Sequence, residues 1–198
     1  MNNINNIFEK IDNEISAYIL GYYWADGSLY KNTLELELQE DDVDILKYFN
    51  KIICNNSKKI FYRFRHNSGT YRLIITNKLI ANSLRELGFK NKNERLLPKI
   101  NENLIVHFIR GYFDGDGCYM CRIRGSKNEY RVDISGRKEF IELIEKFLPN
   151  FDSCEIINNK TCVSKRIYYH GKESVDNFLN YISKNSSIKL ERKYPVLH

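Results

Sequence analysis

The feature that most constrains this chain is a nine-residue stretch that occurs twice. Residues 19–27 read Ile-Leu-Gly-Tyr-Tyr-Trp-Ala-Asp-Gly, and residues 109–117 read Ile-Arg-Gly-Tyr-Phe-Asp-Gly-Asp-Gly. Each copy is an apolar run with an early glycine that ends in Asp-Gly, and the two aspartates, Asp26 and Asp116, lie about half the chain apart. A repeat at that separation indicates a duplicated half rather than a short solenoid repeat.

The segments around the two motifs follow one another in the same order. Apolar residues at helical spacing predict one helix over about 13–27 and another over about 101–116. Alternating patterns and turn residues predict strands within 28–39 and over 59–66, 70–76, 118–124, 129–135, 153–159 and 162–170. Further helices are predicted over 41–53, 77–87, 137–147 and 171–183. Each half is therefore αββαββα, and the chain is an α+β fold of two pseudo-symmetric halves, 1–98 and 99–198.

Composition excludes several classes of protein. The chain of 198 residues can bury a core, and its 14 Tyr and 11 Phe argue against disorder. The net charge of +6 is compatible with a polyanionic partner. The sequence contains no apolar run of about 18 residues, so no membrane span is predicted. The N-terminal residues carry no secretory or transit signal, so we expect a cytoplasmic protein, or one of an organellar matrix if organelle-encoded, that is not secreted.

Five cysteines include a Cys-x-x-Cys pair, Cys118 and Cys121. Because both fall in a predicted strand, a separation of three residues points them to opposite faces. No second pair of cysteines or histidines completes a zinc site at suitable spacing, and reduced thiols are expected.

The two stretches resemble the nine-residue motif of LAGLIDADG homing endonucleases, a helix that ends in Asp-Gly. The third, eighth and ninth positions of the motif match in both copies. They are Gly21, Asp26 and Gly27 in the first copy and Gly111, Asp116 and Gly117 in the second. The first copy carries Trp24 where the second has Asp114 at position six, and both lack the small residue at position two. The resemblance implies saddle-shaped antiparallel sheets whose two halves meet through the motif helices. The competing interpretation is an ordinary α+β protein with an incidental repeat.

The resemblance also implies a catalytic site. If the motif helices lie side by side, they bring Asp26 and Asp116 together at their C-terminal ends. The two carboxylates then repel each other, and the partial negative charge of the helix C-terminal carbonyls adds to this repulsion unless a cation compensates it. Hard oxygen ligands favour Mg²⁺, so these aspartates are the expected metal ligands. Family sites add a basic residue in each half, for which Lys92 and Lys193 are the candidates. A polar residue at the end of the second strand is expected to position water: Gln39 or Glu40, and Ser135. For an isolated Asp-Gly, a simple helix stop would be the better interpretation.

The strands are the expected DNA-reading surface, because a β-ribbon can enter the major groove. The candidates are the basic residues of the strands: Arg63, Arg65, Arg72, Arg122, Arg124, Arg131, Lys165 and Arg166. Alternating charge is also typical of any solvated sheet. Glu35 and Glu37 put negative charge on this face, and two interpretations stay open: they accept from cytosine N4, or the face is assigned wrongly.

The sequence thus predicts a monomeric, Mg²⁺-dependent, site-specific endonuclease that makes a double-strand break in a long asymmetric DNA target. One alternative is a maturase, which would bind folded intron RNA on the same scaffold. Another is a DNA-binding protein that does not cleave, although no helix-turn-helix is apparent. An intein-embedded nuclease is disfavoured, since no splicing block flanks the repeat.

Overall fold

The computed structural model describes residues 4–65, 68–125, 127–158 and 162–195. The predicted turn residues Asn67 and Ser126, and the predicted strand ends at His66 and Asn159, lie outside these ranges. The first half contains α1 (Glu14–Asp26), β1 (Ser28–Tyr30), β2 (Thr33–Gln39), α2 (Val43–Cys54), β3 (Ile60–Arg65), β4 (Ser68–Thr76) and α3 (Lys78–Glu86). The second contains α4 (Glu102–Asp116), β5 (Cys118–Arg124), β6 (Lys127–Arg137), α5 (Lys138–Ile144), β7 (Asp152–Asn158), β8 (Cys162–His170) and α6 (Lys172–Ser183).

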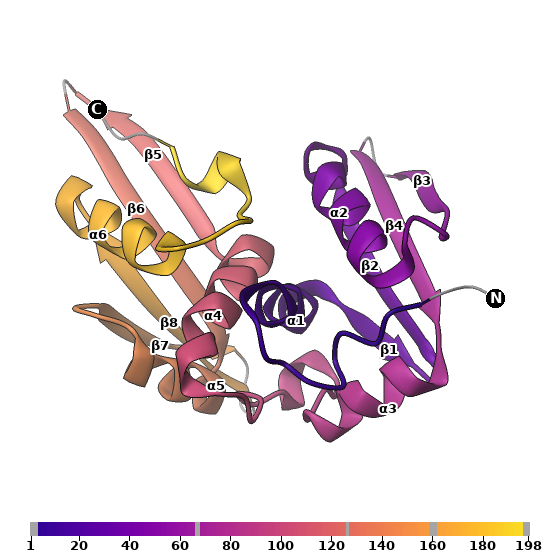
Figure 1. Cartoon of the computed structure of the whole chain (residues 1–198). Coiled ribbons are helices and arrows are strands. Elements are labelled where there is room, and N and C mark those ends of the chain that lie inside the picture. Colours follow the sequence, from indigo (N-terminus) through magenta and orange to yellow (C-terminus); the bar gives the residue numbers. More distant parts are fainter. Residues whose placement is uncertain (1–3, 66–67, 126, 159–161, 196–198) are drawn as a thin grey trace.

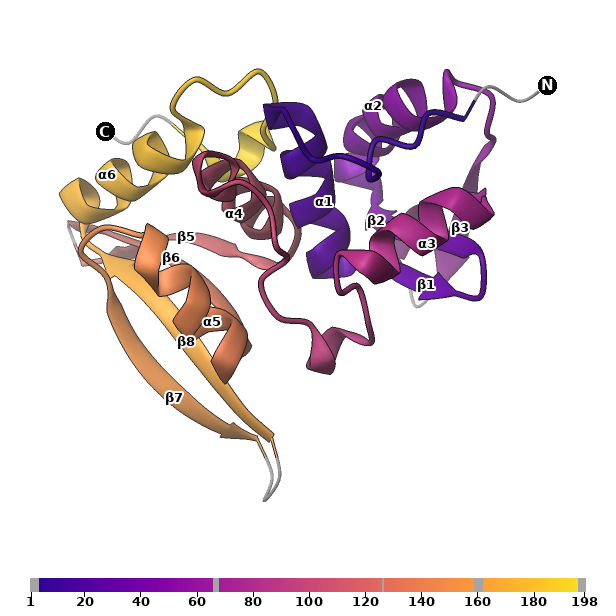
Figure 2. The same cartoon turned by 60° about the horizontal axis from the view of Figure 1, so that its bottom comes forward.

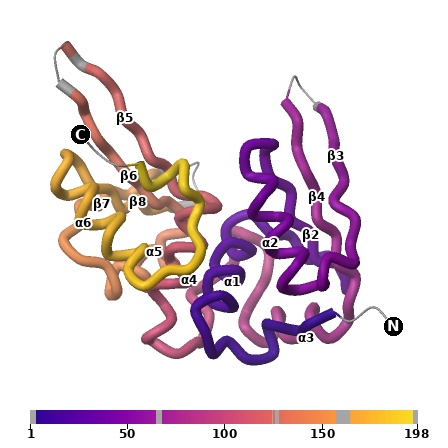
Figure 3. The backbone as a smooth tube through the Cα atoms, turned by 45° about the horizontal axis from the view of Figure 1, so that its top comes forward, coloured from indigo at the N-terminus to yellow at the C-terminus, as the bar shows by residue number. Residues whose placement is uncertain are grey.

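Both halves follow the predicted αββαββα order, and their sheets have the same topology. The strand orders are β1-β2-β4-β3 and β5-β6-β8-β7, antiparallel throughout. Figure 1 shows the two sheets on opposite sides of a central pair of helices, α1 and α4. In Figure 3 the β3–β4 and β5–β6 hairpins extend as two arms away from this pair. The α+β prediction with two similar halves is confirmed.

Each sheet is covered by helices on one face only. Alternation in β2 buries Leu34, Leu36 and Leu38 under α2 and α3, because successive strand residues point to opposite faces. In the second sheet, Val132 and Ile134 are buried in the same way under α5 and α6, which Figure 2 shows lying against that sheet. We call the other face of each sheet, which these helices leave uncovered, the open face.

The halves meet where α1 and α4 touch backbone to backbone. A Cβ atom added at Gly21 would lie 2.0 Å from the carbonyl oxygen of Phe108, and one at Gly111 would lie 2.0 Å from that of Tyr18. Only a residue without a side chain fits such an approach. The large side chain of Arg110 at motif position two joins the helices instead of separating them, because its guanidinium donates to Glu14 at the start of α1 and lies over the ring of Tyr18.

Helix α1 is buried on every side, with ten consecutive residues shielded from solvent. A helix enclosed between a partner helix and a sheet needs no polar stripe, which explains why its sequence is apolar all round. Its aromatic side chains fill the first-half core; the rings of Tyr22 and Tyr23 pack on Phe49 with centroids 5.4 and 5.9 Å apart.

The glycines that follow the motif aspartates end the helices for a reason other than a left-handed backbone. Gly27 and Gly117 are both extended, with φ of −73° and −75°. A Cβ at Gly27 would lie 2.6 Å from the carbonyl oxygen of Tyr23, and one at Gly117 would meet the ring and carbonyl of Phe113. The helix ends were correctly predicted, but lack of space selects glycine here. By contrast, Gly88 after α3 does adopt a positive φ of 92°.

Candidate active site

The two motif aspartates lie at the joined C-terminal ends of α1 and α4. Beside them, Ala25 and Gly115 are packed so closely that a Cβ at Gly115 would lie 2.6 Å from the Cβ of Ala25 and 3.2 Å from the Oδ2 of Asp26. The helices therefore place Asp26 and Asp116 next to each other, as expected from the repeat. Desolvation of the carboxyl group between the helix ends, and then repulsion by Asp116, raises the pKa of Asp26 above its ordinary value.

One lysine forms an ion pair directly with this negative charge. Lys92, in a short helical turn (Lys92–Glu94) between α3 and α4, places its Nζ 2.9 Å from the Oδ2 of Asp116. The hydroxyl of Tyr112, one turn before Asp116, donates to the carbonyl oxygen of Ser135 at 3.1 Å. Burial, and then the two aspartates, raise the pKa of Tyr112 well above that of a free tyrosine, so it stays protonated.

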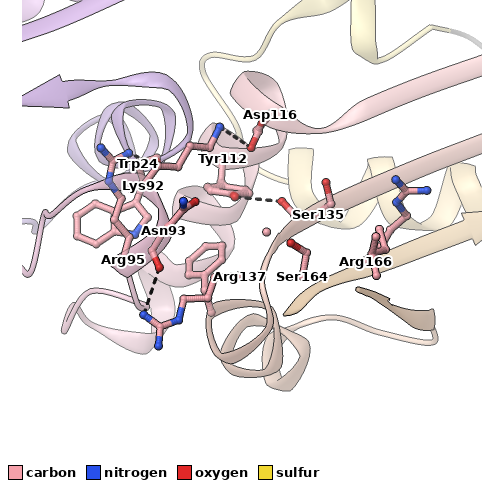
Figure 4. A pocket seen from close by; sticks show the side chains of 13 residues that line it. Trp24, Lys92, Asn93, Arg95, Tyr112, Asp116, Ser135, Arg137, Ser164 and Arg166 are labelled. Atoms are coloured by element: carbon pink, nitrogen blue, oxygen red, sulfur yellow. Dashed lines mark hydrogen bonds and ion pairs between the residues drawn. The ribbon is translucent and has the colours of Figure 1, made fainter. Parts of the chain in front are cut away.

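A pocket of about 340 Å³ opens beside Asp116 and Lys92 (Figure 4). Four cationic side chains line it together with the hydroxyl-bearing Ser135 and Ser164: Lys92, Arg95, Arg137 and Arg166. Cations and hydroxyls are the groups that proteins use to hold phosphate oxygens. Ser135, predicted from the end of its strand, therefore lies in the same site as Asp116 and Lys92.

Lys193 has a different position from the one that its pairing with Lys92 implied. It is buried at 5% exposure, and its Nζ donates to the carbonyl oxygens of Phe113, Asp114 and Gly117, at the C-terminal end of α4. A lysine there satisfies carbonyls that have no partner within the helix.

In the first half the same task belongs to Arg95, which is also 5% exposed. Its guanidinium donates to the carbonyl oxygens of Trp24 at 2.6 Å and Gly27 at 2.7 Å, at the end of α1. The expected pairing of Lys92 with Lys193 is therefore wrong: Lys193 corresponds in its contacts to Arg95, and of these two lysines it is Lys92 whose described contacts include an ion pair with Asp116.

A repeated pattern in the sequence could have identified these connecting segments. Residues 92–98 and 189–195 both read Lys-x-Glu-Arg-x-x-Pro. The pattern makes Lys189 the sequence counterpart of Lys92, yet Lys189 lies 3.7 Å from a carboxylate oxygen of Glu191 and 5.0 Å from the ring centroid of Tyr194. The two halves thus share the pattern but use its side chains differently.

Gln39 and Ser135 do not occupy equivalent places. Strand pairing sets Ser28 opposite Glu35 in the first half and Cys118 opposite Asp133 in the second. Counting on from these pairs, the counterpart of Ser135 is Glu37, and that of Gln39 is Arg137. The predicted equivalence is therefore wrong by two residues, an even shift that keeps the side chains on the open face.

The side chain of Gln39 accepts from the hydroxyl of Ser68 at 2.7 Å, away from the aspartates. Glu40, the alternative to Gln39, is exposed at the start of a short turn of helix (Glu40–Asp42) and packs near Gly69. Neither side chain shares the pocket that contains Ser135.

Motif position six serves to anchor each half's connecting segment. The indole of Trp24 donates to the carbonyl oxygen of Leu96 at 3.1 Å. Asp114 is fully buried and accepts from the hydroxyl of Tyr18 and the backbone N–H of Leu190, both at 2.8 Å. The departure of the first copy from the motif therefore exchanges one anchor for another and leaves the two motif aspartates in place.

The connecting segments also tie each half to the other. The guanidinium of Arg192 makes a bidentate contact with the carboxylate of Asp42, at 2.7 and 2.6 Å, at the start of α2. Reciprocally, Arg137 at the start of α5 donates to the carbonyl oxygen of Asn93 at 3.3 Å. These crossed contacts help to fix the angle between the halves.

The open faces carry most of the basic residues expected to meet DNA. In the first sheet the guanidinium of Arg72 lies 2.6 Å from Glu35 and 3.5 Å from Glu37, and Arg63 lies 3.7 Å from Glu37. The two glutamates therefore share the open face with the arginines and pair with them.

In the second sheet, Asp133 lies 3.3 Å from Arg131 and 3.7 Å from Arg166. Arg122 is exposed on β5, opposite Glu129. Lys165 is the exception, since it lies on the helix-covered face and pairs with Glu145 at 2.7 Å. The backbones of Arg65 and Arg124 lie in β3 and β5, and their side chains are outside the described part of the structure.

Within the described ranges, no group of three or more His, Cys, Asp or Glu residues could hold a metal ion. A cation at the helix ends would therefore take two carboxylate ligands from Asp26 and Asp116 and its other ligands from water or a bound phosphate. In the same part of the chain, no helix is long and apolar enough to cross a membrane.

Comparison with known proteins agrees with this arrangement. Residues 109–193 match the sequence model of the LAGLIDADG endonuclease family. The chain is 30% identical over 182 residues to a reverse gyrase of Methanocaldococcus jannaschii, covering 88% of this chain and 10% of that protein. It is 26% identical over 145 residues to a DNA polymerase of Acanthamoeba polyphaga mimivirus, covering 61% and 8%. The chain thus spans about a tenth of the length of these relatives.

Solved structures share the fold at low identity. The LAGLIDADG homing endonuclease I-SmaMI bound to cleaved DNA matches with a TM-score of 0.57 and 11% identity, over 90% of this chain and 84% of that one. The meganuclease I-AabMI bound to uncleaved DNA matches with a TM-score of 0.57 and 13% identity, over 92% and 87%. A further structure shows I-SmaMI with an uncleaved DNA target in the presence of calcium ions, with a TM-score of 0.57, 11% identity and coverage of 90% and 86%.

Two four-stranded saddles joined through glycine-packed helices that end in aspartate define the LAGLIDADG fold. The matched family model covers the second motif, and the first motif repeats it in both sequence and position. Residues 109–193 thus match the LAGLIDADG endonuclease family, and the whole chain has the fold of that family.

Proposed function

We propose that the chain is a site-specific endonuclease that binds a long, asymmetric DNA duplex as a monomer and cuts both strands with the help of Mg²⁺. The observation that carries this proposal is the meeting of Asp26 and Asp116 at the ends of α1 and α4. Two carboxylates share one site at the junction of the two halves, each of which presents an open sheet face with arginines. Such a pair suits the hydrolysis of a phosphodiester better than it suits binding alone.

The donor set fits a hard divalent cation. Repulsion between the two aspartates contributes to the raised pKa of Asp26, and a bound cation would relieve it. Carboxylate oxygens with water or phosphate oxygens are the ligands that Mg²⁺ prefers. When bound between Asp26 and Asp116, the ion would polarise a phosphate and lower the pKa of an attacking water.

The remaining groups of the site hold the carboxylates and the substrate. Lys92 lies beside Asp116 and places a positive charge where charge would develop on a phosphate. Lys193 and Arg95 fix the ends of α4 and α1 through backbone carbonyls and so keep the two aspartates at a set separation. The basic and hydroxyl side chains of the pocket beside Asp116 would hold phosphate oxygens of the bound strand.

The partner is proposed as double-stranded DNA, because the related structures I-SmaMI and I-AabMI contain it. The two open faces differ in sequence. Glu35 and Glu37 occupy in the first sheet the positions that Asp133 and Ser135 occupy in the second. Unequal faces read unequal half-sites, so the target is expected to lack two-fold symmetry.

The experiment is a selection of bound and cleaved duplexes from a randomised DNA library, with and without Mg²⁺. Asp26→Asn and Asp116→Asn are expected to retain duplex binding and lose cleavage of both strands. Asp44→Asn, an exposed aspartate on α2, serves as the matched control and should cleave normally. Binding without cleavage by the unmodified protein would contradict the nuclease proposal and favour a non-cleaving DNA-binding protein. Retention of folded intron RNA in place of duplex would favour a maturase.

A further inference from the structure

Two aromatic rings stand exposed on the open face of the first sheet. Tyr30 is 74% exposed and Phe61 is 45% exposed. Phe61 is paired directly opposite Arg72, and Tyr30 is paired opposite Thr33, two residues along β2 from Glu35. Because residues directly opposite in an antiparallel pair point to the same face, both rings share the open face with these polar groups.

The charges around the rings are largely satisfied within the sheet. Arg72 and Arg63 are held by Glu35 and Glu37, which leaves the rings as the chemically distinct features of this face. A lysine flanks each ring: the Nζ of Lys31 lies 5.5 Å from the centroid of Tyr30, and that of Lys59 lies 5.6 Å from the centroid of Phe61.

The second sheet offers different side chains at the corresponding places. The strand registers make Met120 the counterpart of Tyr30, and Cys154, opposite Arg166, the counterpart of Phe61. The rings therefore distinguish the first half from the second. In the proposed complex with duplex DNA, the groups that the rings contact would lie in one half-site only.

The major groove presents one apolar group to a protein, the C5-methyl of thymine, and aromatic side chains are among those that contact it. Lysines beside the rings match phosphates that border the groove on both sides. We infer that the N-terminal half reads thymine methyl groups through Phe61 and Tyr30, so that its half-site carries thymine at fixed positions. This inference rests on the proposed binding of duplex DNA and assigns the specificity of one half of that surface.

The test replaces thymine by deoxyuridine, which removes only the methyl group. In duplexes selected by the protein, replacement is made separately in each half-site, and affinity is measured at fixed salt concentration. Binding is expected to weaken about fourfold for each methyl group lost from contact in one half-site, the factor for exposing a group of that size. Replacement in the other half-site should leave affinity unchanged.

Variants connect the effect to the rings. Phe61→Ser and Tyr30→Ser are each expected to lose the sensitivity to the methyl group that the replaced ring contacts, and the double variant is expected to bind thymine and deoxyuridine duplexes equally well. Phe64→Ser is the matched control, because Phe64 lies on the same strand, is 64% exposed and points to the opposite face. It should keep the full sensitivity to the methyl group.

Selection of no duplex at all would overturn the proposed function and this inference with it. Duplex binding that ignores deoxyuridine in both half-sites would overturn the inference alone. The inference also fails if Phe61→Ser and Phe64→Ser are equally sensitive to the methyl group, a result that would favour a protein partner for the exposed rings of β3. Circular dichroism and equal urea midpoints for the variants exclude misfolding as the cause.

Discussion

Asp114 is a carboxylate enclosed by protein on all sides. It is fully buried, with its Oδ2 bonded to Tyr18 and Leu190, while its Oδ1 is without a partner among the described atoms. Burial raises its pKa to about 6, from an ordinary value of 3.8, although the hydrogen bonds that it accepts act in the opposite direction. At 1.36 kcal/mol for each pKa unit, ionisation of this group costs the folded protein roughly 3 kcal/mol at neutral pH.

The direction of the pH effect follows from which state holds the proton. Between pH 6 and 3.8 the folded protein keeps Asp114 protonated while the unfolded chain does not, so the free energy of unfolding rises as the pH falls. A single group with these two pKa values contributes about 1.4 kcal/mol of added stability between pH 7 and pH 5.

The assay is urea unfolding of the unmodified protein and of Asp114→Asn at pH 7, 6 and 5, with a chelator present. Asparagine keeps the acceptor for Tyr18 and Leu190 but does not titrate. The unmodified protein is expected to gain about 1.4 kcal/mol more than the variant over this range. Asp26, whose pKa is also raised, titrates in both proteins and cancels in the difference. Equal gains by the two proteins, at equal m-values, would refute the reasoning.

Four further substitutions test the helix contact, the helix ends and the site. Gly111→Ala should destabilise the protein by about 1–3 kcal/mol in urea, because its Cβ meets backbone that cannot move aside; an unchanged midpoint would contradict the packing. Lys193→Met and Arg95→Met should each cost about 1–3 kcal/mol by thermal unfolding, since each leaves buried carbonyls unpaired, and loss from only one of them would contradict their equivalence. Lys92→Met should slow single-turnover cleavage about a hundredfold with duplex affinity kept, and an unchanged rate would remove Lys92 from the site.

The order of helices and strands along the chain was predictable because it depends on local patterns. The motif helices ended at Asp26 and Asp116 as expected. The errors fell on positions that depend on register or on loops. Lys165 and Arg166 were both assigned to the open face, although adjacent strand residues point to opposite faces.

The connecting segments were the least predictable part of the site. A lysine in a polar loop is ordinarily solvated, and nothing local indicates that Lys193 instead enters the core to satisfy the end of α4. The repeated Lys-x-Glu-Arg-x-x-Pro pattern marks both segments, but Arg192 contacts Asp42 in the other half while Arg95 stays within its own. Such differences arise from the contacts available in three dimensions.

The sequence by itself determined that two similar halves exist and that each contributes an aspartate after an apolar helix, because helical periodicity and the Asp-Gly stop are local properties of the chain. Only the tertiary structure decided how the halves differ: which lysine reaches Asp116, which cations bind the helix ends, and which strand residues share a face. Those choices are set by the closeness of α1 and α4 and by strand register, which join residues far apart in the sequence.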